Sequence, residues 1–255
     1  MNPSAAAPEA RAEAIAPSGP VERFEPGAPS VSAERVLRIQ GYADLDRVRP
    51  VIRRAADAMA RRAEELSRPR VAFRRVAVES LDPGGDLVLE GGRGLHCAAF
   101  PRQLAGCDEV VPFVLTVGAP LAQEVVDLVE KGDLLEGLLL EAAGWLAIED
   151  ATRQFKAAIR RDCESRGRRM TPRLGPGYSY KVDGSMVSWG LEEQPALFAL
   201  LEGAQLPVTL MASCAMTPKM SRSGLYGTGP QVEASAPQPP RASPLRKSKT
   251  RGAGR

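Results

Sequence analysis

The chain has 255 residues, 44% of them hydrophobic, so it can bury a core as one large domain or two small ones. Aromatic residues make up only 5%, which predicts a core packed mainly with Leu, Val, Ala and Met. The 34 basic and 31 acidic side chains nearly balance, so the composition disfavours a folded nucleic-acid-binding surface. The four cysteines lack CxxC spacing, which argues against a zinc knuckle or a thioredoxin-like redox pair.

Both ends of the chain have the composition of disordered segments. Residues 1–30 are rich in Ala, Pro and Glu and predict a disordered arm, because few large apolar side chains can offset the entropy of ordering. Residues 230–255 predict a disordered basic tail, for which RNA binding stays a distant alternative. Neither a secretory signal nor a run of about 18 apolar residues is evident, so we expect a cytoplasmic protein with no membrane partner.

The first half of the folded region alternates strands and helices. Val36–Ile39 reads as a short strand, and Asp46–Leu66 has apolar residues at helical spacing with an Arg-rich outer face. Val71–Val78 predicts a strand with an irregularity at Arg74 and Arg75. The turn Asp82–Gly85 then leads to a strand over Leu87–Leu89, which predicts a β-hairpin.

A buried strand and a long helix dominate the middle of the chain. Glu109–Val117 is almost continuously apolar, as a central strand is, and Pro120 can occupy the first turn of a helix that runs to about Glu130. Gly132 and Asp133 offer a helix stop and an N-cap, after which Leu134–Arg161 predicts a long helix.

The last part of the folded region is richer in glycine and proline. Met170–Val187 predicts an irregular loop, Gln194–Leu201 a short helix, and Val208–Met211 a strand. We expect residues 31–229 to form the folded region, with an N-terminal α/β part over 31–130 and a long helix plus ligand loop over 131–229. The alternation of helices and short strands agrees with an α+β fold.

Familiar catalytic signatures are missing. The sequence has no GxSxG elbow, no GxxxxGK phosphate loop and no GxGxxG. Its single histidine, His96, could act as a base, but a lone histidine beside a strand is more often a structural hydrogen-bonding residue. These absences argue against Ser-His and Cys-His hydrolases.

Arg173–Tyr178 is the segment with the most chemical information. Arg173 offers a planar fork to a carboxylate, and Gly177 allows a ligand to approach the backbone. Tyr178 adds an aromatic face that attracts a cation such as a sulfonium. A surface loop whose arginine pairs locally is the alternative interpretation of this short pattern.

Several elements together resemble the activation domain of cobalamin-dependent methionine synthase. The RxxxGY element is followed, at a similar interval, by a short helix and by an AMxP…SGxY element over Ala215–Tyr226. Val36–Tyr42, Thr116–Gly118 and Leu140–Glu149 are similar to stand-alone members of the same superfamily. The resemblance covers about residues 31–229 and implies an α+β fold with a mixed or mainly antiparallel sheet flanked by helices.

The resemblance implies a binding site for S-adenosylmethionine. Arg173 would bind the methionine carboxylate, and Tyr226 would lie near the nucleoside. Glu149 would receive the ammonium or a ribose hydroxyl, although an ordinary surface carboxylate is an equal alternative. The residues assigned to the ligand are Arg173, Gly175, Pro176, Gly177, Tyr178, Tyr226 and Glu149.

A second set of residues would face the corrinoid. Ala215, Met216 and Pro218 would form an apolar lip over the corrin, and a loop packed into its own core is the alternative. The sequence departs from the family at Cys214 and Thr217, and over Ser179–Gly184 where the family has a Pro- and Cys-containing strand. These departures bear on ligand orientation and corrin contact, whereas the Arg173 element is retained.

The resemblance implies an accessory protein for reductive reactivation of a corrinoid enzyme. Its partner would be a cobalamin-binding methionine synthase or a corrinoid methyltransferase subunit, with a flavoprotein or ferredoxin as electron donor. Because the DxHxxG loop that ligates cobalt is missing, cobalamin would be held by the partner chain. A non-catalytic module that caps or assembles the corrinoid protein, or senses S-adenosylmethionine, is the alternative.

Overall fold

The structure, a computed structural model, describes residues 19–232. Residues 1–18 of the predicted arm and 233–255 of the predicted tail lie outside the described residues. The prediction that the arm is disordered up to residue 30 is wrong for its last part, because strand β1 (Glu22–Phe24) pairs antiparallel with β2 (Arg70–Phe73). Phe24 also packs on Phe155 with 5.8 Å between ring centroids. The pairing with β2 and this aromatic contact therefore hold residues 22–24 in place.

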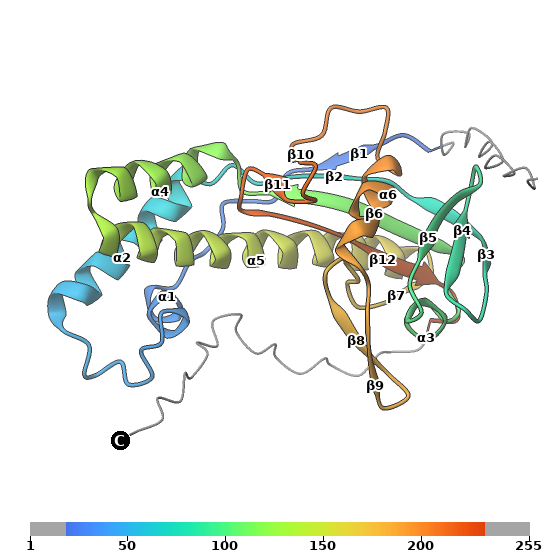
Figure 1. Ribbon diagram of the computed structural model, residues 1–255, viewed down its shortest axis with the longest axis horizontal. Coiled ribbons are helices and arrows are strands. Elements are labelled where there is room, and N and C mark those ends of the chain that lie inside the picture. Colours follow the sequence, from blue (N-terminus) through green and yellow to red (C-terminus); the bar gives the residue numbers. More distant parts are fainter. Residues whose placement is uncertain (1–18, 233–255) are drawn as a thin grey trace, which may run out of the picture.

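One eight-stranded sheet forms the centre of the molecule (Figure 1). Its strand order is β1-β2-β6-β3-β4-β5, with β12 on the other side of β6 and β7 next to β12. The remaining strands of the sheet are β3 (Val76–Leu81), β4 (Asp86–Leu89), β5 (Arg93–His96), β6 (Glu109–Thr116), β7 (Arg169–Met170) and β12 (Ser221–Gly229). Every pairing between strands of residues 19–232 is antiparallel, which confirms the predicted α+β class with a mainly antiparallel sheet.

The predicted strand features around the hairpin are confirmed. The irregularity at Arg74 and Arg75 separates β2 from β3, and both strands pair with the central strand β6. The Asp82 carboxylate stabilises the β3–β4 turn, since its Oδ1 accepts hydrogen bonds from the backbone nitrogens of Gly85 (2.7 Å) and Asp86 (2.8 Å).

The helices of residues 19–232 are α1 (Ala33–Ile39), α2 (Pro50–Leu66), α3 (Phe100–Gln103), α4 (Ala119–Lys131), α5 (Leu134–Ser165) and α6 (Gln194–Ala199), with a 3-10 turn η1 (Leu191–Glu193) before α6. Helix α5 contacts β6, β7 and β12, and α6 contacts β5. Helices α1, α2 and α4 pack together with α5 at one end of the molecule (Figure 1). The four predicted helices are confirmed as α2, α4, α5 and α6, and Gly132 ends α4 in the left-handed conformation at φ 89°. No helix within residues 19–232 is long and apolar enough to cross a membrane.

The predicted strand at Val36–Ile39 is wrong, because this segment lies within helix α1. Ser32 caps the helix, with its side chain accepting a hydrogen bond from the backbone nitrogen of Arg35 at 3.4 Å. Val36 and Leu37 are buried, and α1 packs against α2 and α5. The apolar run is too short to distinguish strand from helix by periodicity, so tertiary packing decides its conformation.

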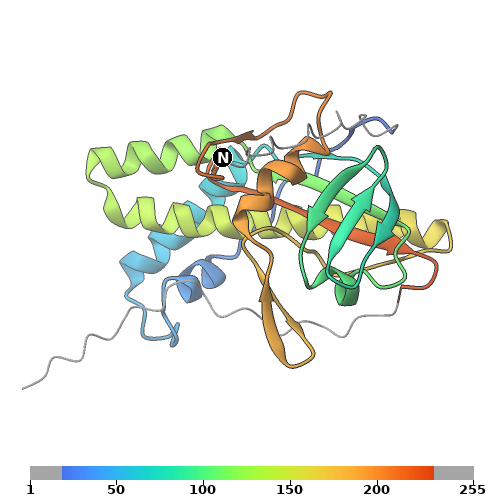
Figure 2. The ribbon, with the colours of Figure 1, turned by 45° about the vertical axis from the view of Figure 1, so that its right-hand side comes forward.

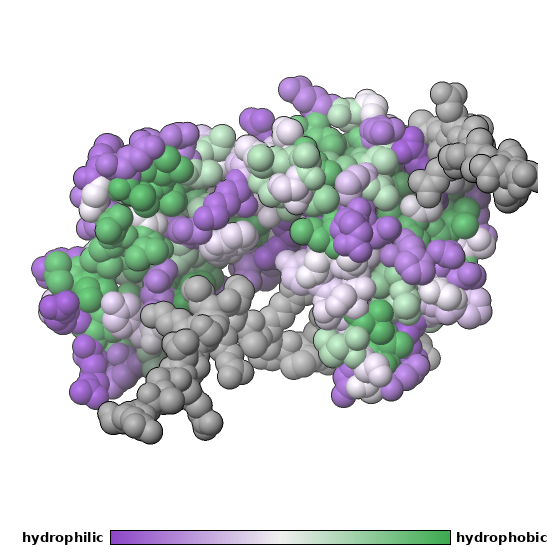
Figure 3. Space-filling view, viewed as in Figure 1, coloured by the Kyte–Doolittle hydropathy of each residue, from purple (hydrophilic) through white to green (hydrophobic). Residues whose placement is uncertain are grey.

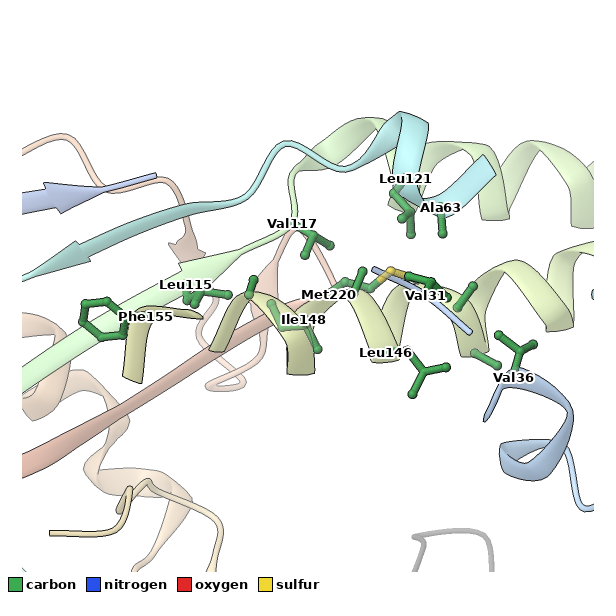
Figure 4. Packing of buried hydrophobic residues seen from close by; sticks show 14 of the residues in the cluster. Val31, Val36, Ala63, Leu115, Val117, Leu121, Leu146, Ile148, Phe155 and Met220 are labelled. Atoms are coloured by element: carbon green, nitrogen blue, oxygen red, sulfur yellow. The ribbon is translucent and has the colours of Figure 1, made fainter. Parts of the chain in front are cut away.

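Helix α5 is the scaffold of one face of the sheet (Figure 4). Phe155 packs against Phe113 of β6 and Phe73 of β2, at centroid distances of 5.1 and 5.2 Å. Gly144 allows Met220 to approach the helix, because a Cβ there would overlap the Met220 sulfur. Helix α5 therefore lies in direct contact with the AMxP…SGxY element at Met220 and β12.

The predicted irregular loop over Met170–Val187 is only partly correct. Strands β8 (Ser179–Val182) and β9 (Ser185–Ser188) form a hairpin that projects from the body of the protein (Figure 2). Asp183 and Gly184 occupy its turn with φ of 47° and 87°, as a two-residue hairpin turn requires. The predicted strand near Val208 is confirmed as β10 (Thr209–Leu210), which pairs with β11 (Met216–Thr217).

Candidate functional site

The loop after β7 runs alongside strand β12. Leu174 and Leu225 exchange backbone hydrogen bonds of 2.9 and 2.8 Å, so the loop extends the sheet for one bridge. A Cβ on Gly224 would overlap the carbonyl oxygen of Leu174. The glycine of the SGxY element is therefore required for the loop to lie this close to β12.

Arg173 is held between the two predicted motifs. Its Nη1 donates to the carbonyl oxygen of Ser223 at 3.1 Å, and its Cζ lies 4.6 Å from the centroid of the Tyr178 ring. A Cβ on Gly175 would lie 2.8 Å from Arg173 Nη1, so this glycine leaves room for the guanidinium. The structure thus brings Arg173, Gly175 and Tyr178 together with β12.

Tyr180 stiffens the loop and was missed by the sequence analysis. Its hydroxyl accepts a hydrogen bond from the backbone nitrogen of Gly175 (2.7 Å) and donates to the Gly175 carbonyl (3.1 Å). Gly177, at φ 80°, donates from its nitrogen to the Trp189 carbonyl at 2.8 Å. Gly175 and Pro176 are buried, and Gly177 is exposed. The first two therefore shape the loop, and Gly177 is its exposed glycine.

Tyr226 lies in the core, within electrostatic range of Arg173 and Arg222. The ring is fully buried and stacks on Phe113 at 5.4 Å and 10°. The hydroxyl has no hydrogen-bond partner within residues 19–232. Burial raises the pKa of Tyr226 to about 12, and the positive charges of Arg173 and Arg222 oppose that shift.

Arg222 is a second arginine at the site that sequence reasoning did not select. It is partly buried, and its Nη1 donates to the Thr152 hydroxyl on α5 at 3.2 Å. Burial, followed by the charge of Arg173, lowers the pKa of Arg222. Within residues 19–232, neither Arg173 nor Arg222 forms an ion pair with a carboxylate. The alternation of side chains along β12 would have pointed to Arg222 once Tyr226 was selected.

Glu149 lies at the margin of the site. On α5, its carboxylate pairs with Arg35 at 3.3 Å, and the two side chains are 54% and 49% exposed. Its negative charge also acts on Arg222, which places the two groups within electrostatic range. The carboxylate predicted to receive the ligand's ammonium is thus engaged by Arg35.

The residues predicted to face a corrin lie next to the same strand. Ala215 is exposed, whereas Met216 and Pro218 are partly buried. Buried Gln194, which the sequence suggested only as a helix start, links the two motifs. Its Nε2 donates to the Cys214 carbonyl at 3.1 Å, and its Oε1 accepts from the Ser223 hydroxyl at 3.2 Å. The AMxP segment is thereby tied to the SGxY strand.

His96 has a local partner away from the arginines. Its exposed Nδ1 lies 2.7 Å from the Asp86 carboxylate, across the β4–β5 ladder. Its backbone nitrogen donates to the Glu193 carboxylate at 3.1 Å. Over residues 19–232, no group of three or more His, Cys, Asp or Glu side chains is arranged to hold a metal ion.

Comparisons with known proteins identify the architecture. No model of a known protein family matches the chain, and no curated protein matches it. Among solved structures, the crystal structure of the MetH reactivation domain bound to AdoHcy superposes with a TM-score of 0.57 and 16% sequence identity, over 88% of this chain and 84% of that chain. At this identity the likeness concerns the fold, an antiparallel sheet flanked by helices. The protein therefore has the fold of the MetH reactivation domain.

Proposed function

We propose that the protein binds S-adenosylmethionine at the Arg173–Tyr178 loop and assists the reductive reactivation of a corrinoid methyltransferase. The observation that carries the proposal is the position of Arg173, whose guanidinium is oriented by Ser223 and Tyr178 and forms no ion pair within residues 19–232. An arginine held in this way is prepared to bind a carboxylate with little loss of side-chain entropy. The fold of the MetH reactivation domain bound to AdoHcy supports the same ligand class.

The site's own residues suit binding and positioning rather than acid–base chemistry. Arg173 would hold the carboxylate, Gly177 would offer exposed backbone, and the Tyr226 hydroxyl would mark the inner end of the site. The guanidinium of Arg173 already stacks over the Tyr178 ring, so the first role of Tyr178 is to orient Arg173. Transfer of a methyl group from a sulfonium needs alignment and exclusion of water, which these residues can supply.

The methyl acceptor would be the cobalt of a cobalamin held by a partner chain, after one-electron reduction by a flavoprotein or ferredoxin. The partner would be a cobalamin-dependent methionine synthase or a related corrinoid methyltransferase. Ala215, Met216 and Pro218 would face the corrin, and Met211, which is 52% exposed, adjoins Ala215 through a 2.8 Å backbone hydrogen bond. These apolar groups offer a surface that a flat apolar macrocycle can cover.

A second apolar surface lies at the end of the molecule where α4 and α5 meet (Figure 3). Val129, Leu134 and Leu138 are 48%, 59% and 55% exposed there. Exposed large aliphatic side chains at one end of a domain are typical of a protein contact. This surface is available to the protein part of the same corrinoid partner.

The proposed function is tested by calorimetric titration of S-adenosylmethionine into the protein and into Arg173→Ala. Binding to the wild-type protein and its loss in Arg173→Ala is the expected result. Arg61→Ala, which removes an exposed arginine on α2, is the matched control and should bind as the wild type does. Absence of binding to the wild-type protein, alone and with a cobalamin-loaded partner, would overturn the proposal.

A non-catalytic capping or S-adenosylmethionine-sensing module is the second candidate function. It is favoured by the pairing of Glu149 with Arg35, because the carboxylate predicted to receive the ammonium is engaged by another side chain. Incubation of the protein with a cobalamin-loaded partner, a reductant and S-adenosylmethionine distinguishes the two candidate functions. Formation of S-adenosylhomocysteine together with a methylated corrinoid supports reactivation, and binding without turnover supports the sensing module.

A further inference from the structure

Two guanidinium groups share the side of β12 that faces α5. Side chains alternate along a strand, so Arg222, Gly224 and Tyr226 point to the same side. Tyr226 belongs to the core that α5 covers, and Arg222 donates to Thr152 of α5, which confirms that orientation. Arg173 reaches across the gap that Gly224 leaves, with its Nη1 3.3 Å from the place of a Cβ on that glycine. The two arginines therefore converge beside the Tyr226 hydroxyl.

The charges of this arrangement favour an anion. Two like charges lie close together and partly out of water, and burial with the charge of Arg173 lowers the pKa of Arg222. Thr152 gives Arg222 a neutral partner, and no carboxylate of residues 19–232 pairs with either arginine. The Tyr226 hydroxyl is buried without a hydrogen-bond partner in the same part of the chain. Buried donors of this kind are normally satisfied by an acceptor, and two positive charges beside one phenol favour an acceptor that carries negative charge.

We propose that Arg222 is a second anion-binding residue, which with Arg173 and the Tyr226 hydroxyl holds the carboxylate of the ligand between β12 and α5. The identity of the ligand as an S-adenosyl amino acid rests on the proposed function, whereas the anion subsite rests on the side chains alone. Arg222 is then a specificity-determining residue. The site selects adenosyl sulfonium or thioether compounds that carry a free carboxylate over those that lack one.

The test compares ligands with and without the carboxylate. S-adenosylmethionine and 5′-methylthioadenosine are titrated by calorimetry into the wild type, Arg222→Gln, Arg222→Lys and the control Arg61→Gln. Arg222→Gln should weaken S-adenosylmethionine by between about 10-fold and 100-fold, because a hydrogen bond to a charged group is lost, and should leave 5′-methylthioadenosine within about 2-fold. Arg222→Lys should recover part of the loss, and Arg61→Gln should change neither ligand.

A structural role for Arg222 would give a different pattern. If Arg222→Gln weakened both ligands equally and lowered the melting temperature, the inference would be overturned while the proposed function stood. If the wild type bound neither compound, the proposed function would fail, and sulfate would then test the anion subsite. Sulfate should raise the melting temperature of the wild type and of Arg61→Gln more than that of Arg222→Gln. An equal rise in all three proteins contradicts the subsite.

Discussion

The guanidinium carbon of Arg173 lies 4.6 Å from the centroid of the Tyr178 ring, and its Nη1 donates to the Ser223 carbonyl on β12. This contact joins two motifs that are 50 residues apart in the chain. It fixes the direction of the guanidinium before any ligand arrives. The affinity of the site for a carboxylate should therefore depend on the ring of Tyr178 as well as on Arg173.

The Tyr178 ring should matter more than its hydroxyl. Tyr178→Phe keeps the surface under the guanidinium and should leave the dissociation constant for S-adenosylmethionine within about 2-fold. Tyr178→Leu removes the cation–π contact, which is worth about 0.5–1 kcal/mol at a partly exposed position, and should weaken binding by roughly 2-fold to 5-fold. Calorimetric titration measures both changes, and a larger loss in Tyr178→Phe than in Tyr178→Leu would contradict this role.

The close approach of the loop to β12 predicts that Gly224 is intolerant of a side chain. Gly224→Ala would place its Cβ against the Leu174 carbonyl oxygen, and we expect a loss of about 2–4 kcal/mol in the free energy of unfolding. Gly184→Ala is the matched control, because no atom lies within 4 Å of its Cβ position and only its φ of 87° is unfavourable. That variant should lose about 1 kcal/mol. Urea denaturation of both variants makes the comparison, and equal losses would show that backbone conformation alone is responsible.

The two hydrogen bonds of the Tyr180 hydroxyl should hold the loop in its shape. Tyr180→Phe removes both while it keeps the buried ring, and should lower the free energy of unfolding by about 1–2 kcal/mol. The loop should also become more open to exchange, so amide hydrogen exchange at Gly175 should accelerate. Unchanged exchange there, with unchanged stability, would mean that the loop is held by its other contacts.

The buried phenol of Tyr226 predicts a pH dependence of stability in alkali. Burial raises its pKa to about 12 from the ordinary value of 10.0, so the folded state retains a proton that the unfolded state has lost. The stabilising contribution is full below pH 10 and falls as the pH rises toward 12, by about 1.4 kcal/mol per unit. Tyr226→Phe should have a shallower decline of stability between pH 10 and 12 than the wild type, measured by urea denaturation at each pH. A parallel decline in the two proteins would rule out this titration.

Phe155 is the aromatic centre between α5 and the sheet. It contacts the rings of Phe24, Phe73 and Phe113 at 5.1–5.8 Å and is fully buried. Phe155→Ala should lower the free energy of unfolding by about 3–5 kcal/mol, because it leaves a cavity that the flanking rings cannot fill. The exposed Leu134→Ala on the same helix is the control and should change stability by less than about 0.5 kcal/mol. Thermal and urea unfolding measure both variants.

The sequence by itself determined the elements whose signals are local. Long helical periodicity identified α5, the Gly132 stop separated it from α4, and the apolar run of β6 indicated its central place in the sheet. The Asp82 turn predicted the β3–β4 hairpin, because the turn chemistry lies within four residues. Arg173 and Tyr178 could also be selected from the sequence, because both belong to the local RxxxGY pattern and the family resemblance gave that pattern a meaning.

Only the tertiary structure decided the features that depend on distant partners. The segment around Val36 forms helix α1 because α2 and α5 bury it. Strand β1 is ordered because it pairs with β2 and its Phe24 packs on Phe155. Alternation along β12 indicates only that Arg222 shares a side with Tyr226, and it is the pairing of the loop with β12 that sets Arg222 beside Arg173. Local periodicity indicates which residues avoid water. The approach of the Arg173 and Arg222 side chains depends on the register between β12 and the loop that carries Arg173, and this register is set only when the whole sheet forms.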